Sequence, residues 1–251
     1  MKTTVISILT QKGGVGKTTS SIHLSDCFAS TKRKVLLIDF DSQCNLTLGM
    51  KIDDNNFTIK DFLEKKGKLN FFQKGNSNNI YVLVGSPDLE NISLNQNSLK
   101  DSLAAINGIF DFVIIDCPPK PLNNSLTLGE IALFASDYII SPIEPEEYSI
   151  SGVYTLYPSI LNLKEKHNLK LKYLGFFFNR VMVNSRDFKD YYDEISNSIA
   201  GTSLFKTFIR QDTNINKAKK LGKTIFEYSP SSRASHDFQF LHKEIIKKMK
   251  L

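Results

Sequence analysis

The sequence is poor in the features that mark secreted and membrane-spanning proteins. It has three cysteines in 251 residues, Cys27, Cys44 and Cys117, and their spacing matches no close pair and no metal-binding pattern. No apolar run approaches about 18 residues, and no apolar segment precedes the first predicted strand. We therefore expect a cytoplasmic protein with reduced cysteines, without a signal peptide or a transmembrane helix.

Negative charge is scarce in the last fifth of the chain. Residues 201–251 carry 11 Lys/Arg and four Asp/Glu, whereas residues 1–200 carry 21 and 22. The net charge of +6 therefore comes entirely from the C-terminal end. A basic segment of this kind indicates a polyanionic partner, either nucleic acid or an anionic membrane, although a solvated lysine-rich surface has the same composition.

Short apolar runs alternate with segments of helical spacing. Buried strands are predicted over residues 4–9, 35–38, 80–84, 112–115, 138–140 and 173–178, and residues 205–209 are compatible with an edge strand. Helices are predicted over residues 19–30, around 57–63 and over about 236–250. We find no repeat and no low-complexity linker. The pattern predicts one domain over residues 1–251 in the α/β class, an open, mostly parallel sheet with helices on both faces.

The loop after the first predicted strand reads QKGGVGKTT and resembles a phosphate-binding loop. Gly16, Lys17 and Thr18 fit the end of G-x-x-x-x-G-K-[ST], while Gln11 stands where the first glycine is expected. Glycines allow backbone N–H groups to approach phosphates, the lysine bridges the β- and γ-phosphates, and the threonine hydroxyl ligates Mg²⁺. The predicted nucleotide-binding residues of this loop are Lys12, Gly13, Gly14, Val15, Gly16, Lys17, Thr18 and Thr19. An incidental glycine-rich turn is the weaker alternative, since a strand precedes the loop and a helix follows.

Acidic residues follow two of the buried strands. Ligands of open α/β sheets bind at the carboxyl ends of the strands, where Asp39, Asp41 and Asp116 fall. We expect Asp116 to hold Mg²⁺ through its water shell, because Mg²⁺ takes few protein carboxylates directly. We favour Asp41 as the residue that orients the attacking water, and Asp39 as support for the loop.

Lys12 is one lysine more than a phosphate-binding loop needs. Lys17 already serves the bound triphosphate, and a second ammonium group beside it would repel the first. If Lys12 points outward, it can reach the phosphates of a second copy, as an arginine finger does. This predicts a symmetric dimer that encloses two ATP molecules, with a solvent-exposed lysine of no function as the alternative.

These motifs together resemble the deviant Walker A ATPases of the ParA/MinD group. The group's K-G-G-x-G-K-T-T motif matches Lys12 to Thr19 completely, and FDFVIIDCPP, residues 110–119, is similar to its Walker B stretch. VLLIDFDSQCNLT, residues 35–47, resembles the D-x-D segment, with Ser42 and Cys44 in place of its proline and glycine. Residues 221–245 resemble the end of ParA proteins, although Ile209 replaces a proline that is common before the arginine.

The resemblance implies a cycle between an ATP-bound dimer and a monomer. It implies ATP and Mg²⁺ as cofactors, Lys12 acting across the dimer, Asp41 in hydrolysis, Asn179 on the adenine ring and Glu146 near the dimer interface. ParA dimers bind double-stranded DNA without sequence preference, and a ParB-type partner stimulates their hydrolysis. We therefore expect a nucleoid-associated plasmid or chromosome partition protein. Because the sequence starts at its first strand, we expect no helix-turn-helix domain for operator DNA.

Basic residues of the last fifth of the chain are the predicted DNA contacts. They are Arg210, Lys217, Lys219, Lys220, Lys223 and Arg233, which suit salt-dependent contacts to phosphates. Nothing in the sequence resembles an arginine finger in cis or a glutamine that would orient water. We therefore expect slow hydrolysis without a partner, below about one turnover per second.

Two further functions remain as alternatives. A MinD-like regulator of division-site placement would use the C-terminal segment as an amphipathic helix on lipid, with Phe238, Leu241, Ile245 and Met249 on one face. We expect that face to pack on the sheet instead, which makes membrane binding the weaker interpretation. A metabolic or redox enzyme on the same scaffold is less favoured, because Cys44 and Cys117 do not match the cluster-binding positions of reductase relatives.

Overall fold

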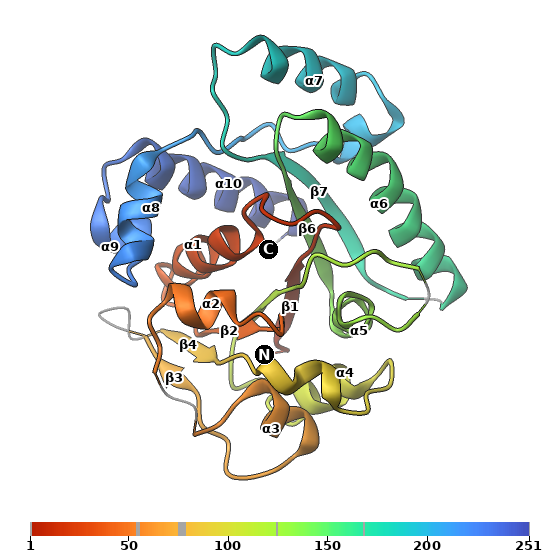
Figure 1. The fold of residues 1–251 in the computed structure, drawn as a ribbon, viewed down its shortest axis with the longest axis vertical. Coiled ribbons are helices and arrows are strands. Elements are labelled where there is room, and N and C mark those ends of the chain that lie inside the picture. Colours follow the sequence, from red (N-terminus) through yellow and green to blue (C-terminus); the bar gives the residue numbers. More distant parts are fainter. Residues whose placement is uncertain (1, 54–55, 75–78, 124, 168, 251) are drawn as a thin grey trace.

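The described residues form one seven-stranded sheet, in the order β3-β4-β2-β5-β1-β6-β7 (Figure 1). This computed structural model describes residues 2–53, 56–74, 79–123, 125–167 and 169–250. The strands are β1 (Thr4–Ile8), β2 (Val35–Asp39), β3 (Phe72–Gln73), β4 (Ile80–Leu83), β5 (Phe112–Asp116), β6 (Tyr138–Ile143) and β7 (Lys172–Phe178). All neighbouring strands pair in parallel except β3 and β4. The predicted open, mostly parallel sheet is confirmed, and the antiparallel β3 is an addition to it.

Helices cover both faces of this sheet. They are α1 (Lys17–Ala29), α2 (Asn45–Gly49), α3 (Ile59–Glu64), α4 (Ser98–Ala104), α5 (Leu128–Ala135), α6 (Glu147–Lys166), α7 (Arg186–Ser196), α8 (Thr213–Lys220), α9 (Ile225–Tyr228) and α10 (Arg233–Met249), with the 3₁₀ helices η1 (Pro87–Asn91) and η2 (Ile199–Ser203). One core cluster joins the sheet to α3, α4, α5, α6 and α7. The other joins it to α1, α2, α9 and α10, which lie together on the opposite face (Figure 1).

Side chains of the central strands alternate between the two cores. In β2, Leu36 and Ile38 face the α3–α7 core, whereas Val35 and Leu37 face the α1–α10 core. All five residues of β2 are buried, as a strand covered on both faces requires. The continuous apolar run at residues 35–38 follows from this double coverage.

Local chemistry shifts several boundaries relative to the sequence prediction. Helix α1 begins at Lys17 rather than Thr19, directly after Gly16, whose φ is 92°. Helix α10 begins at Arg233 rather than His236, because the Ser232 side chain accepts a hydrogen bond from the Ser235 N–H at 3.2 Å. Strand β6 continues beyond residue 140 to Ile143, past the point where β1 ends.

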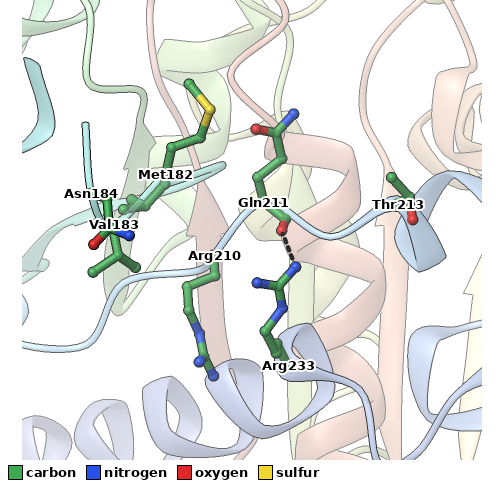
Figure 2. A pocket seen from close by; sticks show the side chains of 8 residues that line it. Met182, Val183, Asn184, Arg210, Gln211, Thr213 and Arg233 are labelled. Atoms are coloured by element: carbon green, nitrogen blue, oxygen red, sulfur yellow. Dashed lines mark hydrogen bonds between the residues drawn. The ribbon is translucent and has the colours of Figure 1, made fainter.

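The edge strand predicted at residues 205–209 is wrong. Strand β7 is the last strand of the sheet, and the segment beside it makes isolated bridges at Leu204 and Arg210. Phe205 and Ile209 each donate one backbone hydrogen bond to β7, at 2.7 and 2.8 Å. The two donors are four residues apart, but their acceptors, Phe176 and Phe178, are two residues apart, so the segments do not keep the register of a continuous ladder. The segment then leads into a loop beside the start of α10, where Arg233 donates to the Gln211 carbonyl oxygen (Figure 2).

Candidate functional site

The loop between β1 and α1 lies at the carboxyl end of the sheet. No side chain of the described loop caps the N-terminus of α1, so its first backbone N–H groups are available to an anion. Gly16 is the residue before α1, and its positive φ favours glycine. A Cβ at Gly16 would also collide with the side-chain nitrogen of Asn179. Both the backbone conformation and the position of Asn179 therefore favour glycine here.

Lys17 lies buried inside this loop. Its Nζ donates a hydrogen bond to the Lys12 carbonyl oxygen at 2.9 Å, and the residue is 7% exposed. Burial lowers the pKa of Lys17, while the nearby Asp116, Cys117 and Asp41 act in the opposite direction. The ammonium group thus lies across the loop, close to the acidic groups of the site.

Strand register brings the predicted acidic residues together. Asp39 at the end of β2 pairs with Asp116 at the end of β5, and both are almost fully buried. The Ser21 hydroxyl donates to Asp116 at 3.0 Å. Burial and the neighbouring Asp39 raise the pKa of Asp116, and hydrogen bonds from Thr18 and Ser21 oppose this shift. Thr18 and Asp116 are therefore adjacent, and their hard oxygen donors fit Mg²⁺.

The other two carboxyl groups differ in their contacts. One oxygen of Asp39 accepts hydrogen bonds from the Thr47 N–H and hydroxyl at 2.9 and 2.7 Å, and burial raises the pKa of Asp39 to about 6. These bonds attach the start of α2 to the end of β2, as the supporting role predicted for Asp39 would require. Asp41 accepts the Gln43 N–H at 3.0 Å and is 7% exposed. Asp41 also lies close enough to Lys17 to affect the pKa of that lysine.

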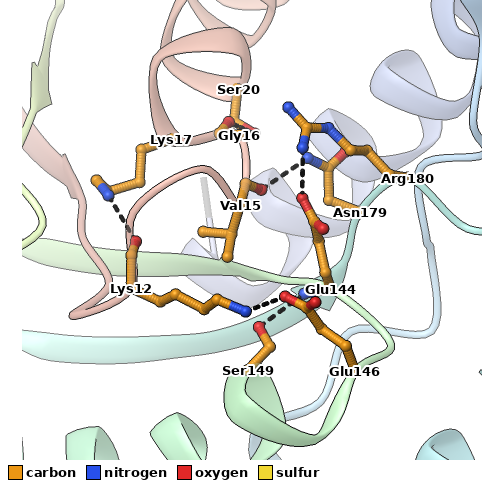
Figure 3. Close-up of polar contacts among 10 residues, drawn as sticks. All are labelled: Lys12, Val15, Gly16, Lys17, Ser20, Glu144, Glu146, Ser149, Asn179 and Arg180. Atoms are coloured by element: carbon orange, nitrogen blue, oxygen red, sulfur yellow. Dashed lines mark hydrogen bonds and ion pairs between the residues drawn. The ribbon is translucent and has the colours of Figure 1, made fainter.

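The side chains of Lys12 and Lys17 point to opposite sides of the loop (Figure 3). The Lys12 ammonium forms an ion pair with Glu146, which immediately precedes α6, and lies 5.8 Å from the ring centre of Tyr148. The side chains of Lys12 and Glu146 are 31% and 45% exposed. The Lys12 side chain thus turns away from Lys17, and its contact is Glu146 of the same chain.

Asn179 follows β7 and contacts the loop rather than open space. Its side-chain nitrogen donates to the Val15 carbonyl oxygen at 2.8 Å, and the residue is 2% exposed. Its neighbour Arg180 pairs with Glu144 at 2.7 Å (Figure 3). The sequence pattern did not point to Ser21, Glu144 or Arg180. Ser21 could have been found, since it lies one helical turn after Lys17 and so faces the same strand ends.

The six predicted DNA-binding residues have different surroundings. Arg210 makes a two-pronged ion pair with Asp237 at 2.7–3.2 Å, so its charge is already matched. Arg210 and Arg233 border a cavity of about 440 Å³ beyond β7. Lys219 and Lys223 border a smaller cleft beside Thr18 and Thr19 of the loop. The exposed residues Lys217 and Lys220 complete the basic end of α8.

The described residues hold no group of three or more His, Cys, Asp or Glu side chains that could bind a metal ion by themselves. Cys27, Cys44 and Cys117 are all free thiols. Within the part of the chain that the structure covers, no helix combines the length and the apolar character needed to cross a membrane.

The sheet, the glycine loop and the acidic strand ends define a P-loop NTPase fold. Comparison with known proteins gives the family. Residues 3–173 match a family model described as an AAA domain, and the chain is 31% identical to a ParA family protein of Chlamydia pneumoniae over 98% of both chains. The chain belongs to the ParA family of P-loop proteins.

Two further relatives extend this comparison. The sporulation initiation inhibitor protein Soj of Bacillus subtilis is 29% identical, with 96% of this chain and 97% of Soj covered. The septum site-determining protein MinD of Pyrococcus horikoshii, solved with Mg-ADP, is 29% identical with a TM-score of 0.78. That likeness covers 98% of this chain and 96% of MinD. The relatives thus include both ParA-type and MinD-type proteins.

Proposed function

We propose that this protein is an Mg²⁺-dependent ATPase whose ATP-bound dimer acts in the partition of DNA. Relatives named as a chromosome-partitioning ATPase and as ParA support this proposal, as does the neighbour solved with Mg-ADP. The connection of all described strands in one sheet supports a single ATPase domain over residues 1–251. The protein would work in the cytoplasm, with its ATP form on the nucleoid.

The direction of the Lys12 side chain carries the dimer proposal. Lys17 lies within its own loop, whereas Lys12 turns away from it toward Glu146 at the exposed start of α6. A lysine so directed serves a triphosphate better in a facing subunit than in its own. Two copies related by a two-fold axis would then complete each other's sites.

Each residue of the site then has a role in the reaction. Backbone N–H groups from Gly13 to Thr19 hold the phosphates, and Lys17 leaves the Lys12 carbonyl oxygen to bind the β- and γ-phosphates. Thr18, and Asp116 through water, would hold Mg²⁺, which neutralises the charge that develops on the phosphates. Asp41 orients the attacking water. Asn179 and Glu146 border the nucleotide at the adenine end and at the dimer interface.

DNA and a ParB-type protein are the proposed partners. The exposed basic end of α8 supports sequence-independent contacts to phosphates, and dimerisation would double its charge. A ParB-type partner would supply the stimulation of an ATPase that turns over slower than about once per second alone. The MinD-like alternative needs a free apolar helix face, but Phe238, Leu241 and Ile245 of α10 are fully buried against the sheet. DNA is therefore the favoured partner.

The proposal is tested by measuring mass and DNA binding with ATP, with ADP and without nucleotide. Light scattering should give a dimer in ATP and a monomer otherwise, and only the ATP form should bind duplex DNA. Lys12→Ala should bind ATP but remain a monomer. Lys32→Ala, which also removes an exposed lysine, is the matched control and should dimerise. A wild-type monomer in all nucleotide states would exclude the proposed dimer.

A further inference from the structure

The exposed side of α10 carries a row of cations that the proposed ATP site does not use. Arg233, His236, Phe240, Lys243 and Lys247 are exposed at spacings of three or four residues, and the exposed Lys250 directly follows the helix in a left-handed conformation. Residues at this spacing lie on one face of a helix. We call this row the α10 basic face. On the opposite side, Phe238, Leu241 and Ile245 are fully buried.

The charge of the α10 basic face is not neutralised within the described structure. None of the ion pairs among the described residues involves Lys243, Lys247 or Lys250. Both acidic residues of α10 are engaged elsewhere. Asp237 pairs with Arg210, and Glu244 accepts the backbone N–H groups of Lys206 and Thr207 at 2.9 and 3.0 Å. The lysines of this face therefore remain available to an external anion.

The α10 basic face borders a cavity at the amino-terminal edge of the sheet, where the other charges are paired. A cavity of about 530 Å³ opens beside Lys243, and Lys2 and Arg33 also line it. Asp111 in the same lining pairs with Arg33 at 3.2 Å. Lys2 pairs with Asp137 at 2.9 Å. Beyond Lys243 the cavity therefore adds no unpaired charge to the α10 basic face, which ends here on the side of the sheet away from the phosphate loop.

We propose that the α10 basic face is a docking surface for the phosphate backbone of duplex DNA. From Arg233 to Lys247 the helix advances about 21 Å, and duplex DNA presents one negative charge per about 1.7 Å of its axis. A row of separated cations on a rigid helix suits such a continuous line of phosphates. An anionic membrane fits less well, because the apolar side of α10 is occupied by the sheet and Phe240 is the lone aromatic side chain in the exposed row.

This inference rests on the proposed function, since it assigns a surface to the predicted DNA binding. It also adds residues to that prediction, because Lys243, Lys247 and Lys250 lie outside the set on α8 and its neighbouring loops. Two contact surfaces on one protomer would give a steeper dependence of DNA affinity on salt than either surface alone.

The test compares two triple variants with the same change in charge. Lys243→Gln/Lys247→Gln/Lys250→Gln alters the α10 basic face. Lys65→Gln/Lys66→Gln/Lys68→Gln alters three exposed lysines at the end of α3, on the opposite face of the sheet. Affinity for a labelled duplex is measured with ATP over a range of salt. We expect the α10 variant to bind at least tenfold more weakly, with a log–log salt slope smaller by about 0.9 for each DNA phosphate that it no longer neutralises. The α3 variant should match wild type.

Each contrary outcome has its own meaning. A wild-type protein that does not bind duplex DNA with ATP would overturn the proposed function. Wild-type binding together with an unchanged affinity and salt slope in the α10 variant would overturn this inference alone. Sedimentation with phosphatidylglycerol vesicles completes the test. If the α10 variant lost vesicle binding but kept its DNA affinity, the surface would belong to a membrane and the inference would be wrong.

Discussion

Cys44 shows how a single residue accommodates a departure from the motif it occupies. It stands where the resembled D-x-D segment has glycine, and it has a φ of 52° in the left-handed region. Its N–H still donates to the Asp41 carbonyl oxygen at 2.9 Å, so the turn that follows Asp41 is kept. The local cost is backbone strain, since a side chain disfavours this conformation.

Replacement of Cys44 by glycine should stabilise the protein. We expect Cys44→Gly to raise the free energy of unfolding by about 0.5–1 kcal/mol, because the relief of strain exceeds the added entropy of the unfolded chain. Cys44→Ala keeps the strain and should give no such gain. Urea unfolding of the three proteins measures the difference. Equal stability of the glycine and alanine variants would show that the turn is not strained.

His23 couples stability to pH at the residue scale. It is 4% exposed, its Nδ1 accepts the Ile225 N–H at 3.3 Å, and burial lowers its pKa from 6.5 to about 3. The folded state therefore holds neutral imidazole, and the unfolded state takes up a proton below pH 6.5. The stability from this group is complete above pH 6.5 and is lost as the pH falls toward 3.

His23→Gln should remove this dependence while keeping a hydrogen-bond acceptor. Between pH 6 and pH 4, wild type should lose up to about 1.4 kcal/mol per pH unit more than the variant. His242, whose pKa is lowered to about 4, stays in both proteins and cancels in the comparison. Urea unfolding at several pH values gives the two curves. Parallel curves would contradict the assignment.

Among the elements, the contact between the end of β7 and the phosphate loop links distant parts of the chain. Asn179 donates to Val15 and contacts Gly16, so it positions the loop. The resemblance predicts that the same side chain binds adenine. The two roles predict different effects on ligand binding. A residue that positions the loop affects the binding of any triphosphate, whereas a residue that contacts adenine affects the binding of ATP alone.

Asn179→Ala should therefore weaken the binding of inorganic tripolyphosphate as well as the binding of ATP. The loss of one buried hydrogen bond of about 1 kcal/mol predicts about fivefold weaker binding of both ligands. Isothermal titration measures the two affinities, and Asn197→Ala at the exposed end of α7 serves as the control. Weaker ATP binding with unchanged tripolyphosphate binding would favour the adenine role instead.

Helices and strands differed in how well the sequence predicted them. The apolar strands were predicted because double coverage makes them continuous apolar runs, as in β2 and β5. Helix α5 was missed because seven of its eight residues are buried and leave no polar stripe. Helix α6 was missed because Gly152 and Pro158 interrupt its pattern. Hydrophobic periodicity predicts a helix only where one face of the helix is exposed to solvent.

At the scale of the whole molecule, the proposed dimer can form only after the ion pair between Lys12 and Glu146 breaks. A lysine that acts across the dimer has to leave Glu146 first. Both side chains are partly exposed, so the pair contributes about 1 kcal/mol or less. The ion pair thus favours the orientation of the Lys12 side chain toward Glu146. It is weak enough for Lys12 to leave Glu146 and bind a triphosphate instead.

Glu146→Gln should favour the ATP dimer. Weakening the ion pair should lower the dimer dissociation constant in ATP by about two- to fivefold, which corresponds to the small energy of a half-exposed pair. Glu147→Gln makes the same charge change at the exposed next residue and should have no effect. Analytical ultracentrifugation with ATP measures both. A Glu146→Gln protein that dimerises less well would show that the Glu146 carboxylate stabilises the dimer instead of competing with it for Lys12.

By itself, the sequence determined the class of the fold, the position of the phosphate loop and the chemistry of its residues, because strand periodicity and loop spacing are local properties. It also showed that the loop has a second lysine, Lys12, and the repulsion between two neighbouring ammonium groups made the direction of that side chain the question to resolve. Only the tertiary structure decided which charges remain available. Arg210 is neutralised by Asp237, a partner 27 residues away, whereas Lys243 and Lys247 on α10 form no ion pair with any residue that the structure describes. Ion pairing depends on contacts between distant segments, and no local pattern records them.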